Sequence, residues 1–381
     1  MKNSKSKNNT VLLLDPRGIV LSDLSVTASR QYEYAKKLSK LDSDLKYIVF
    51  SSFNGSHADV KRVQFEIINL YHKTFNSFVF AYLAYKKIFD RSIDVKLIAV
   101  GDPWESYWSA YFLNKFLKSK IPIQIQVHGD IANSLWRKIN LKNRFRFFLA
   151  KSSLNKCEVI RCVSKEQKLN LVNAFGLDKR KIIVIPVPIA AVNNPLVPAK
   201  RPRTIGLIGR IHEDRGIWNF VELVKNLNKL DTNFKLLIVG DGPARDKFIN
   251  QLEKVIPKNR IKYLGQISQG TLRSSWKSIG VLVSMAPVES YGRVLRESLL
   301  AGVPVWATAS SGVVNLLNSA EPGTVKVLDF EKDESGLYKD FESLLKVKVG
   351  SKFRDKFIKE NNSYADKLAK SWIDTIENQK K

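Results

Sequence analysis

The chain has 381 residues, of which 44% are hydrophobic, and a formal net charge of +27. This length favours two domains, each long enough to bury its own core. The lack of a run of 18 apolar residues argues against a membrane-spanning helix, and the presence of only two cysteines argues against a disulfide scaffold.

The positive charge predicts attraction to polyanions such as nucleic acid, anionic lipid headgroups or phosphorylated substrates. It does not choose among them, because basic residues are spread along the whole chain, and a lysine-rich composition with a solvated surface explains the same charge. The apolar residues 11–14 are too few for the core of a signal peptide. We therefore expect a cytoplasmic protein, and peripheral contact with the inner face of the cell membrane remains open.

The chain begins with alternating strands and helices. Residues 11–14 and 47–50 predict strands, and a helix opened by Thr27 or Ser29 lies between them. Gly18 then lies in a loop at the carboxyl end of the first strand, where backbone can approach a ligand. The loop lacks G-x-G-x-x-G, so a dinucleotide fingerprint is not supported.

Residues 95–100 and 121–127 predict two further buried strands, separated by an aromatic-rich helix over 104–118. The second strand ends at His128, which a glycine follows. A single histidine is usually a satisfied core or turn residue. His128 is nevertheless a candidate site residue, because ligand-binding loops gather at the carboxyl ends of parallel strands.

The segment from 134 to 156 contains seven Lys or Arg residues, several aromatic residues and no acidic residue. Basic residues interleaved with aromatic ones suit an interfacial helix on anionic lipid. The apolar positions do not keep to one helical face, which weakens this interpretation. Membrane contact and a half-buried helix with solvent-reaching lysines both remain open.

The first domain is expected to end after a strand over 158–163, a capping box at 164–167 and a last strand over 182–185. Prolines then recur without periodicity, which is typical of a linker. We place the first domain at 1–188 and the linker at 189–203.

The second domain restarts with a strand that ends at Arg210, a loop that includes Arg215, and a helix over 217–230. Two cations beside glycines and a helix N-terminus can bind a dianion, because guanidinium groups and backbone N–H groups both match phosphate oxygens. Residues 235–239 and 261–264 predict two more strands, each followed by a glycine-containing loop.

Residues 279–287 form an apolar run that predicts a strand buried on both faces of a parallel sheet. A loop and a helix follow, and Ser290 is expected to cap this helix. Glu289 then lies at the carboxyl end of the strand, Gly292 lets backbone approach a ligand, and Glu297 points from the helix toward the same crevice.

This Glu-x7-Glu pattern, with its Gly-Val-Pro-Val ending, resembles the E-x7-E signature of the retaining GT-B glycosyltransferases of family 4, also called glycosyl transferases group 1. Gly209-Arg210 and Arg215-Gly216 resemble the family's Gly-Arg and Lys-Gly steps, and Gly-Asp-Gly-Pro at 240–243 resembles another. Tyr291 stands where the family usually has Phe, and Arg293 where it usually has an apolar residue. Neither departure removes a chemical group on which the motif depends.

The resemblance implies the α/β fold called GT-B, with two facing Rossmann-like domains and parallel sheets. The first domain would be the acceptor side, residues 204–350 the nucleotide-sugar donor domain, and residues 351–381 a C-terminal helix that crosses back to the first domain. The implied reaction is retaining, metal-independent hexosyl transfer from a nucleotide-diphosphate sugar to a glycan or lipid-linked acceptor, in bacterial-type surface polysaccharide or glycolipid synthesis. Neither a cofactor nor a nucleic-acid partner is expected.

The resemblance also implies roles for individual residues. His128 and Glu289 would be catalytic, on opposite sides of the reacting sugar carbon. Gly18 alone matches the family's glycine-rich loop, which meets the acceptor or the donor phosphates. The implied donor-binding residues all lie in the second domain: Arg210, Arg215, Ser290, Tyr291, Gly292 and Glu297.

Two other function classes remain open. A nonenzymatic polyanion-binding protein explains the charge but gives no reason for the two glutamates and two arginines together. A nucleotide-sugar epimerase of similar fold would turn over the donor without an acceptor. No metal site is expected, because the Asp42-Ser-Asp44 triplet follows a predicted helix rather than a buried strand and is interpreted as a surface turn.

Overall fold

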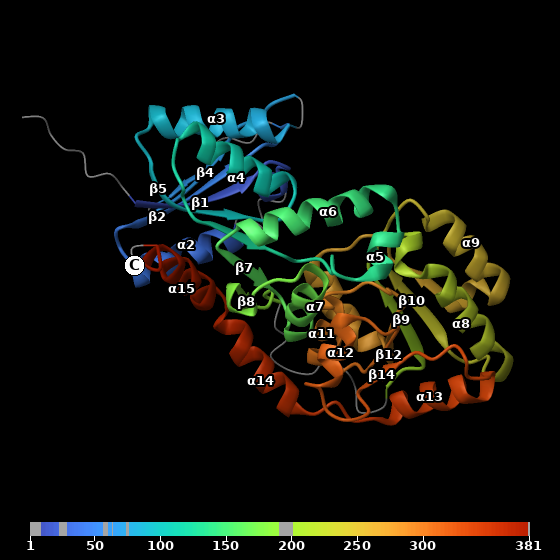
Figure 1. Cartoon of the computed structure of the whole chain (residues 1–381). Helices are drawn as coiled ribbons and strands as arrows, with labels where there is room; N and C mark the ends of the chain where they lie inside the picture. Colours follow the sequence, from blue (N-terminus) through green and yellow to red (C-terminus); the bar gives the residue numbers. More distant parts are fainter. Residues whose placement is uncertain are drawn as a thin grey trace, which may run out of the picture. The chain divides into compact units, whose positions relative to one another are not determined.

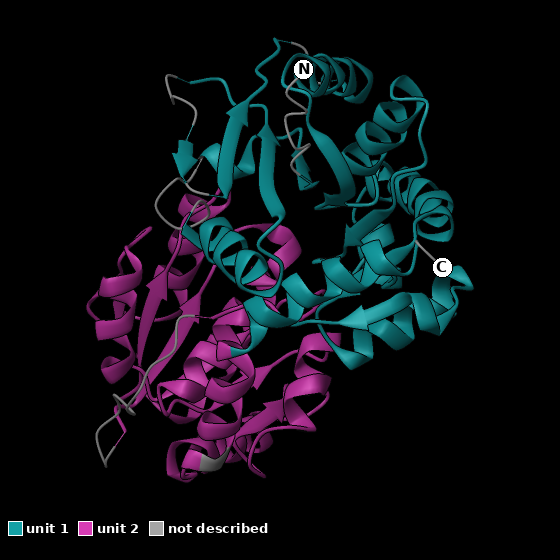
Figure 2. Cartoon of the chain, turned by 90° about the vertical axis from the view of Figure 1, so that its left-hand side faces the viewer, with its two compact units in different colours: residues 1–186, 363–381 teal, residues 187–362 magenta. Residues whose placement is uncertain are grey.

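The computed structural model describes residues 9–22, 29–55, 60–62, 64–73, 76–189 and 201–379. The chain forms two compact units (Figure 2), unit 1 with Met1–Pro186 and Ser363–Lys381, and unit 2 with Val187–Asn362. The chain thus leaves unit 1 near the expected end of the first domain and re-enters it at Ser363 rather than at 351. Most of the expected linker, residues 190–200, lies outside the described residues.

Unit 1 contains a sheet in the order β3-β4-β2-β1-β5-β6-β7-β8, in which all neighbours are parallel except β3 and β4. The strands are β1 (Asn9–Asp15), β2 (Leu45–Ser51), β3 (Val60–Arg62), β4 (Phe65–Asn69), β5 (Asp94–Val100), β6 (Ile123–Gln126), β7 (Val159–Cys162) and β8 (Ile182–Val184). The helices are α1 (Ile19–Ser22), α2 (Ser29–Leu41), α3 (Ser77–Asp90), α4 (Glu105–Phe116), α5 (Ser134–Lys138), α6 (Leu141–Lys156), α7 (Lys165–Phe175) and α15 (Tyr364–Glu377), with a 3₁₀ turn, η2 (Lys179–Lys181).

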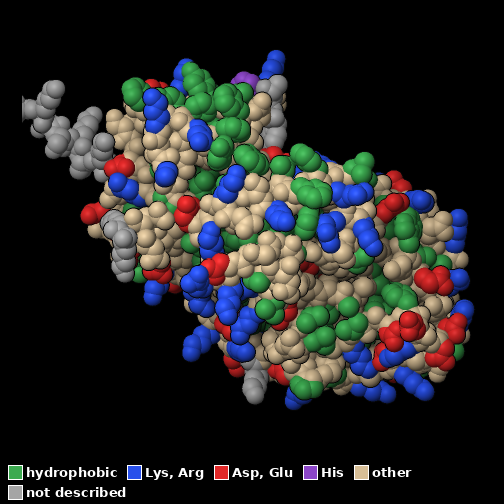
Figure 3. Space-filling view, viewed as in Figure 1, with side chains coloured by type: hydrophobic (Ala, Val, Ile, Leu, Met, Phe, Trp, Pro, Cys, Tyr) green, Lys and Arg blue, Asp and Glu red, His purple; other side chains and the backbone are tan. Residues whose placement is uncertain are grey.

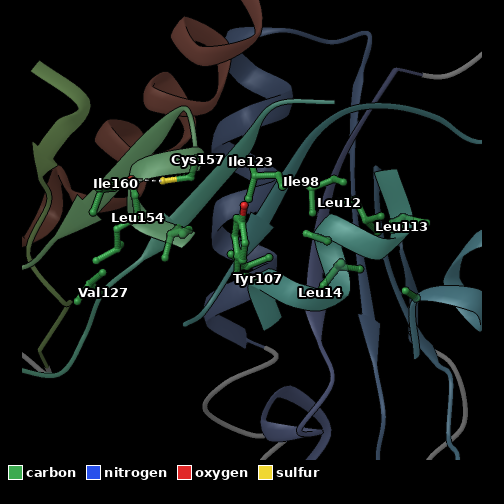
Figure 4. Close-up of a cluster of buried hydrophobic side chains, with 14 of the residues drawn as sticks. Leu12, Leu14, Ile98, Tyr107, Leu113, Ile123, Val127, Leu154, Cys157 and Ile160 are labelled. Carbon is green, nitrogen blue, oxygen red and sulfur yellow. Dashed lines mark hydrogen bonds between the residues drawn. The ribbon is translucent and has the colours of Figure 1, made fainter. Parts of the chain in front are cut away.

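Helices cover both faces of this sheet, with α3 and α4 on one face and α2 and α15 on the other (Figure 1). Successive side chains of β1 point to opposite faces of the sheet. Leu12 and Leu14 therefore pack in the first core, and Val11 and Leu13 in the second. Figure 4 shows part of the first core, where Tyr107 lies beside these strands. A strand buried on both faces explains the continuous apolar run in the sequence.

Unit 2 contains an all-parallel sheet in the order β11-β10-β9-β12-β13-β14. The strands are β9 (Thr204–Ile208), β10 (Lys235–Val239), β11 (Ile261–Tyr263), β12 (Val281–Ser284), β13 (Val305–Ala307) and β14 (Val325–Val327). The helices are α8 (Ile217–Leu230), α9 (Arg245–Val255), α10 (Gln269–Ser275), α11 (Arg293–Leu300), α12 (Ser311–Leu317), α13 (Glu334–Lys346) and α14 (Ser351–Asn362), with 3₁₀ turns η3 (Glu213–Arg215), η4 (Lys258–Arg260) and η5 (Trp276–Ser278). Counted from β9, this is the doubly wound order 3-2-1-4-5-6, in which the direction of winding reverses between β9 and β12.

The C-terminal helix α15 returns to unit 1, as expected. Trp372 of α15 is fully buried, its ring stacks on Tyr47 with centroids 5.0 Å apart, and its Nε1 donates a hydrogen bond to Gln124 Oε1 at 2.9 Å. The hydroxyl of Tyr364 is hydrogen-bonded to that of Tyr34 at 2.7 Å. The helix therefore completes the second core rather than only lying on its surface.

The single C-terminal helix expected over 351–381 is wrong, because α14 ends at Asn362 and α15 begins at Tyr364. The break falls on Asn-Asn-Ser, which are poor helix formers. The side chain of Asn361 also accepts from Ile189 N at 2.8 Å and donates to Ile189 O at 3.0 Å. This amide binds the backbone of a distant segment, which apolar periodicity does not reveal.

We predict that Trp372→Ala lowers the free energy of unfolding of unit 1 by about 3–5 kcal/mol, because it leaves a large cavity and removes the hydrogen bond to Gln124 Oε1. Urea denaturation followed by circular dichroism measures this loss. Lys370→Ala, at an exposed position of the same helix, is the control and should change stability by less than about 0.5 kcal/mol. A loss for Trp372→Ala as small as that of the control would contradict this role for α15.

Candidate functional site

The candidate site of unit 2 lies where the sheet reverses its winding, at the carboxyl ends of β9 and β12. The β9 end continues into Gly209, Arg210 and η3, and the β12 end into the loop that contains Glu289. In doubly wound sheets this is the position at which ligands bind. The fold thus brings together two segments that are about 75 residues apart in the sequence.

Gly216 lets these two loops come into contact. It has a φ of +68°, and a Cβ at this position would overlap the backbone carbonyl of Met285 at the end of β12. A side chain is therefore excluded by both conformation and space. The preceding residue, Arg215, reaches the neighbouring loop, where its Nη2 lies 3.1 Å from Glu289 Oε2. Both side chains are partly exposed, at 31% and 23%.

Glu289 is held by its own loop as well as by Arg215. Its Oε1 accepts a hydrogen bond from Gly292 N at 3.1 Å, and its backbone carbonyl accepts one from Gly312 N at 2.7 Å. A Cβ at Gly312 would crowd the backbone of Tyr291 and Glu289, so this approach also requires glycine. The Glu289 carboxylate is thus fixed in place while part of it remains accessible to a ligand.

Arg210 lies in the same loop as Arg215 but makes a different pair. Its Nη2 is 2.9 Å from Asp214 Oδ2, and its side chain is 59% exposed. Asp214 also has an oxygen 2.7 Å from His212 Nδ1. The loop from 209 to 216 therefore presents two guanidinium groups, each held by a carboxylate.

Glu297 is buried on α11, with 7% of its side chain exposed, and Arg293 Nη2 is 4.0 Å away. Burial raises the pKa of Glu297, and the nearby Arg293 opposes this rise. Arg293 is thus the basic neighbour of the buried carboxylate, which gives a physical role to this departure from the family pattern.

The expectation that Ser290 caps α11 is wrong. The helix begins at Arg293, and its N-cap is Gly292, which has a φ of +69° and no side chain to make a capping hydrogen bond. Ser290 and Tyr291 are both buried in the loop before it. The left-handed conformation at Gly292 delays the start of the helix, which a preference scale for capping residues cannot anticipate.

Arg296 belongs to this site, although the sequence did not single it out. It is buried, its guanidinium carbon lies 3.7 Å from the centroid of the Tyr291 ring, and it donates a hydrogen bond to Asn315 Oδ1 on α12. It therefore links α11 and α12 to the loop that contains Glu289. The sequence could have indicated Arg296, because a charged residue at a core-facing position of a helix is unusual.

The Gly-Asp-Gly-Pro loop after β10 supports the Arg210 loop. A Cβ at Gly240 would overlap the Gly209 carbonyl, and one at Gly242 would overlap the Ile211 carbonyl. Ile211 N donates to Asp241 O at 2.9 Å. These contacts give the glycines of this loop a packing role.

In unit 1, the corresponding strand ends carry Gly18 and His128. Gly18 has a φ of +68°, and a Cβ there would overlap the Ser52 carbonyl, so close packing alone accounts for the glycine. His128 follows β6 and is exposed. Desolvation lowers the pKa of His128, and the positive charges of Arg161 and Arg30 act in the same direction, so the neutral imidazole is favoured.

Two further residues of unit 1 were missed from the sequence. Arg17, in the loop after β1, has its Nη2 2.9 Å from Asp102 Oδ2, in the loop after β5. Asp102 is buried and also accepts from Trp104 N at 2.8 Å and Ser106 Oγ at 2.6 Å. The two loops follow adjacent strands at the winding reversal of this sheet, and their sequence separation hides the pair.

The described residues contain no group of three or more His, Cys, Asp or Glu side chains that could hold a metal ion. Asp44 N donates to Asp42 Oδ1 at 2.9 Å, so the Asp-Ser-Asp triplet forms the expected surface turn. The two cysteines are buried free thiols. No helix in the described ranges combines the length and apolar character needed to cross a membrane.

Comparisons with known proteins match both units. Residues 29–191 match Glycosyltransferase Family 4, and residues 191–364 match Glycosyl transferases group 1. A curated relative, the phosphatidylinositol N-acetylglucosaminyltransferase gpi3 subunit of Schizosaccharomyces pombe, is 25% identical over 174 residues, which are 45% of this chain and 38% of that protein. The chain thus spans about two fifths of the length of this relative.

Solved structures of glycosyltransferases share the fold. Sucrose-phosphate synthase from Thermosynechococcus elongatus has a TM-score of 0.68 and 16% identity, over 97% of this chain and 98% of that one. HepE from Anabaena, solved in complex with UDP-glucose, has a TM-score of 0.62 and 14% identity, over 97% of each chain. At these identities the likeness shows the GT-B fold.

We predict that Gly216→Ala destabilises unit 2 more than Gly265→Ala does. Both glycines have a similar left-handed φ, +68° and +64°, but a Cβ at 265 meets only ordinary contacts while one at 216 overlaps Met285. Gly265→Ala should therefore cost only the conformational strain, roughly 1–2 kcal/mol, and Gly216→Ala clearly more. Chemical denaturation of both variants measures the difference. Equal losses would show that the loops can separate at little cost.

Proposed function

Because this chain belongs to the GT-B glycosyltransferases of the family 4 type, we propose that it transfers a sugar from a nucleoside-diphosphate sugar to a hydroxyl group of a glycan or lipid-linked acceptor, with retention of anomeric configuration. The observation that supports this most is the contact between Arg215 and Glu289 across the winding reversal of unit 2. A guanidinium group suited to a diphosphate lies there beside a carboxylate suited to sugar hydroxyls, which supports the proposal. We further propose bacterial-type surface polysaccharide or glycolipid synthesis as the setting.

Arg210 and Arg215 are assigned to the leaving diphosphate. Each uses one Nη atom in its pair with a carboxylate, at 2.9 Å for Arg210 and 3.1 Å for Arg215. A guanidinium group has five N–H donors, so pairing with a carboxylate is compatible with binding phosphate oxygens. The carboxylates would hold the two arginines in position before the donor binds, which reduces the reorganisation needed as charge develops on the leaving group.

Glu297 and Glu289 are assigned to different parts of the donor. A carboxylate accepts two hydrogen bonds from a vicinal diol, so Glu297 suits the ribose hydroxyls. Glu289, next to Arg215, would orient the sugar hydroxyls and expose the anomeric carbon. His128 of unit 1 remains a predicted catalytic residue.

The proposed reaction is a front-face displacement. The bond from the anomeric carbon to the diphosphate oxygen breaks while a bond to the acceptor oxygen forms on the same face. The acceptor's proton passes to the departing phosphate oxygen, so no separate base is required. This proposal does not need a second carboxylate nucleophile.

Two alternatives are separable by experiment. A nucleotide-sugar epimerase of similar fold would change the donor in the absence of any acceptor, whereas the proposed transferase requires one. A nonenzymatic polyanion binder would bind nucleic acid and show no preference for nucleoside diphosphates. A thermal-shift panel of nucleoside diphosphates and their sugars tests the class, and uridine nucleotides come first because HepE was solved with UDP-glucose.

We predict that the two glutamates differ in what they contribute. Glu297→Gln should weaken the binding of a free nucleoside diphosphate by roughly 1.5–3 kcal/mol, which is typical of a lost charged hydrogen bond. Glu289→Gln should leave that affinity nearly unchanged and lower turnover, because contacts to the moving sugar strengthen at the transition state. Calorimetry and kinetics on both variants, with the exposed Glu222→Gln as control, measure this. Equal loss of affinity in both variants would refute the assignment.

The same assignment predicts a pH dependence. Burial raises the pKa of Glu297 above its ordinary value of 4.5, and only the ionised carboxylate accepts both ribose hydrogen bonds. The affinity for the nucleoside diphosphate should therefore be highest above the raised pKa and decrease as the pH falls through it. Glu297→Gln should lack this step, so the difference between the two titrations isolates it from titration of the phosphate.

We predict that turnover persists in EDTA, because Arg210 and Arg215 supply the positive charge that a metal supplies in other enzymes. Replacing Arg215 by Gln should lower kcat more than it raises KM for the donor. Turnover that EDTA abolishes and only Mg²⁺ or Mn²⁺ restores would contradict this assignment.

A further inference from the structure

The α5–α6 segment, residues 134–156, exposes an apolar stripe. Leu141, Phe145 and Phe148 are 77%, 64% and 69% exposed and lie at positions i, i+4 and i+7 of α6, on one side of the helix. Leu135 on α5 and Ile139 at its end are also exposed, at 46% and 41%. Exposed apolar groups that are contiguous rather than scattered mark an interaction surface.

A second apolar stripe of α6 faces the core of unit 1. Ala150 and Leu154 are fully buried, and Phe147 packs on Phe175 with ring centroids 4.6 Å apart. A helix that is apolar on two sides gives no single amphipathic face, which explains the lack of helical periodicity in its sequence. The lack of a single apolar periodicity therefore does not argue against an interfacial role. The outer stripe is exposed rather than half-buried.

Basic side chains accompany the outer stripe. Lys138, Lys142, Arg144 and Lys151 are exposed, and no acidic residue occurs between 134 and 156. Hydrophobic and basic side chains lie next to each other over α6 in Figure 3. Arg146 differs, because it pairs with Glu105 and lies 4.8 Å from the Trp104 ring. Arg146 is therefore not counted among the cations of this surface.

A hollow of about 690 Å³ lies between α5 and α6. Its lining combines Arg137, Lys138 and Arg144 with Leu141 and Phe148. Arg137 is held over the Phe147 ring, with its guanidinium carbon 4.4 Å from the centroid. Three cations beside apolar side chains match a phosphate headgroup and the start of its acyl chains.

We propose that the α5–α6 segment docks on a membrane surface that contains anionic lipid, with Leu141, Phe145 and Phe148 entering the interface and Lys138, Lys142 and Arg144 at the headgroups. Nucleic acid would bind the cations but offers no aliphatic region in which Leu141 could be buried. A membrane uses both the apolar stripe and the charges. The proposal is independent of the chemistry proposed above.

Another exposed aromatic surface provides a matched comparison. Phe89 on α3 is 74% exposed, similar to Phe148. Lys118 and Lys120, beyond the end of α4, are exposed cations of the same unit. Phe89→Ser removes one exposed ring, as Phe148→Ser does, and the two lysine substitutions change the net charge as much as two cation substitutions on α6. None of them touches the proposed surface.

The test is flotation of the full chain with phosphatidylcholine vesicles, with and without phosphatidylglycerol. Binding should require phosphatidylglycerol and weaken in high salt. Phe148→Ser should reduce it several-fold, and Phe145→Ser with Phe148→Ser at least tenfold. Lys138→Glu with Arg144→Glu should also reduce it at least tenfold. Phe89→Ser, and Lys118→Glu with Lys120→Glu, should retain it. Circular dichroism and thermal midpoints verify that each variant is folded.

Three results would overturn the proposal. The first is no binding to either vesicle. The second is equal loss in the α6 variants and their matched controls, which would indicate a general effect of charge or stickiness. The third is loss with the charge variants alone together with competition by RNA, which would indicate a nucleic-acid surface instead.

Discussion

The donor-side loops of unit 2 depend on backbone approaching backbone without a side chain between them. Gly216 passes against the Met285 carbonyl, and Gly312 against the backbone of Tyr291. This close approach lets Arg215 lie 3.1 Å from Glu289. The charged groups are thus set by rigid loop contacts at the strand ends, which suits a site that must stabilise charge without rearranging.

The two surfaces that we assign to function differ in how their charge is balanced. In the donor-side loops, Arg210 and Arg215 are each paired with a carboxylate. In the α5–α6 segment no acidic residue is present, and exposed Lys and Arg side chains flank an apolar stripe. A compensated cation favours ordered binding of one anion, whereas uncompensated cations favour a diffuse anionic surface. The net charge of +27 alone could not separate these two uses.

The sequence predicted the parts of the structure that depend on local pattern. The helix over 217–230 and the strand over 235–239 agree with α8 and β10 to the residue, because apolar periodicity and flanking glycines are strong there. It failed at Ser290, where a left-handed glycine determines the start of α11. It also missed Arg17 and Asp102, because their contact joins loops 85 residues apart and requires the strand order of the sheet.

The two segments where the chain passes between unit 1 and unit 2 also depend on contacts between residues that are distant in the sequence. Where the chain leaves unit 1, the buried Arg161 donates to the carbonyls of Ile185 and Pro186 at 2.9 Å and 2.8 Å, and its guanidinium carbon lies 5.2 Å from the ring of Tyr364, where the chain returns. In unit 2, Asn361 binds the backbone of Ile189. Burying a cation is costly unless its donors are satisfied. Arg161 is therefore best explained as a structural residue that contacts the chain both where it leaves unit 1 and where it returns. Its position in a predicted strand does not suggest this role.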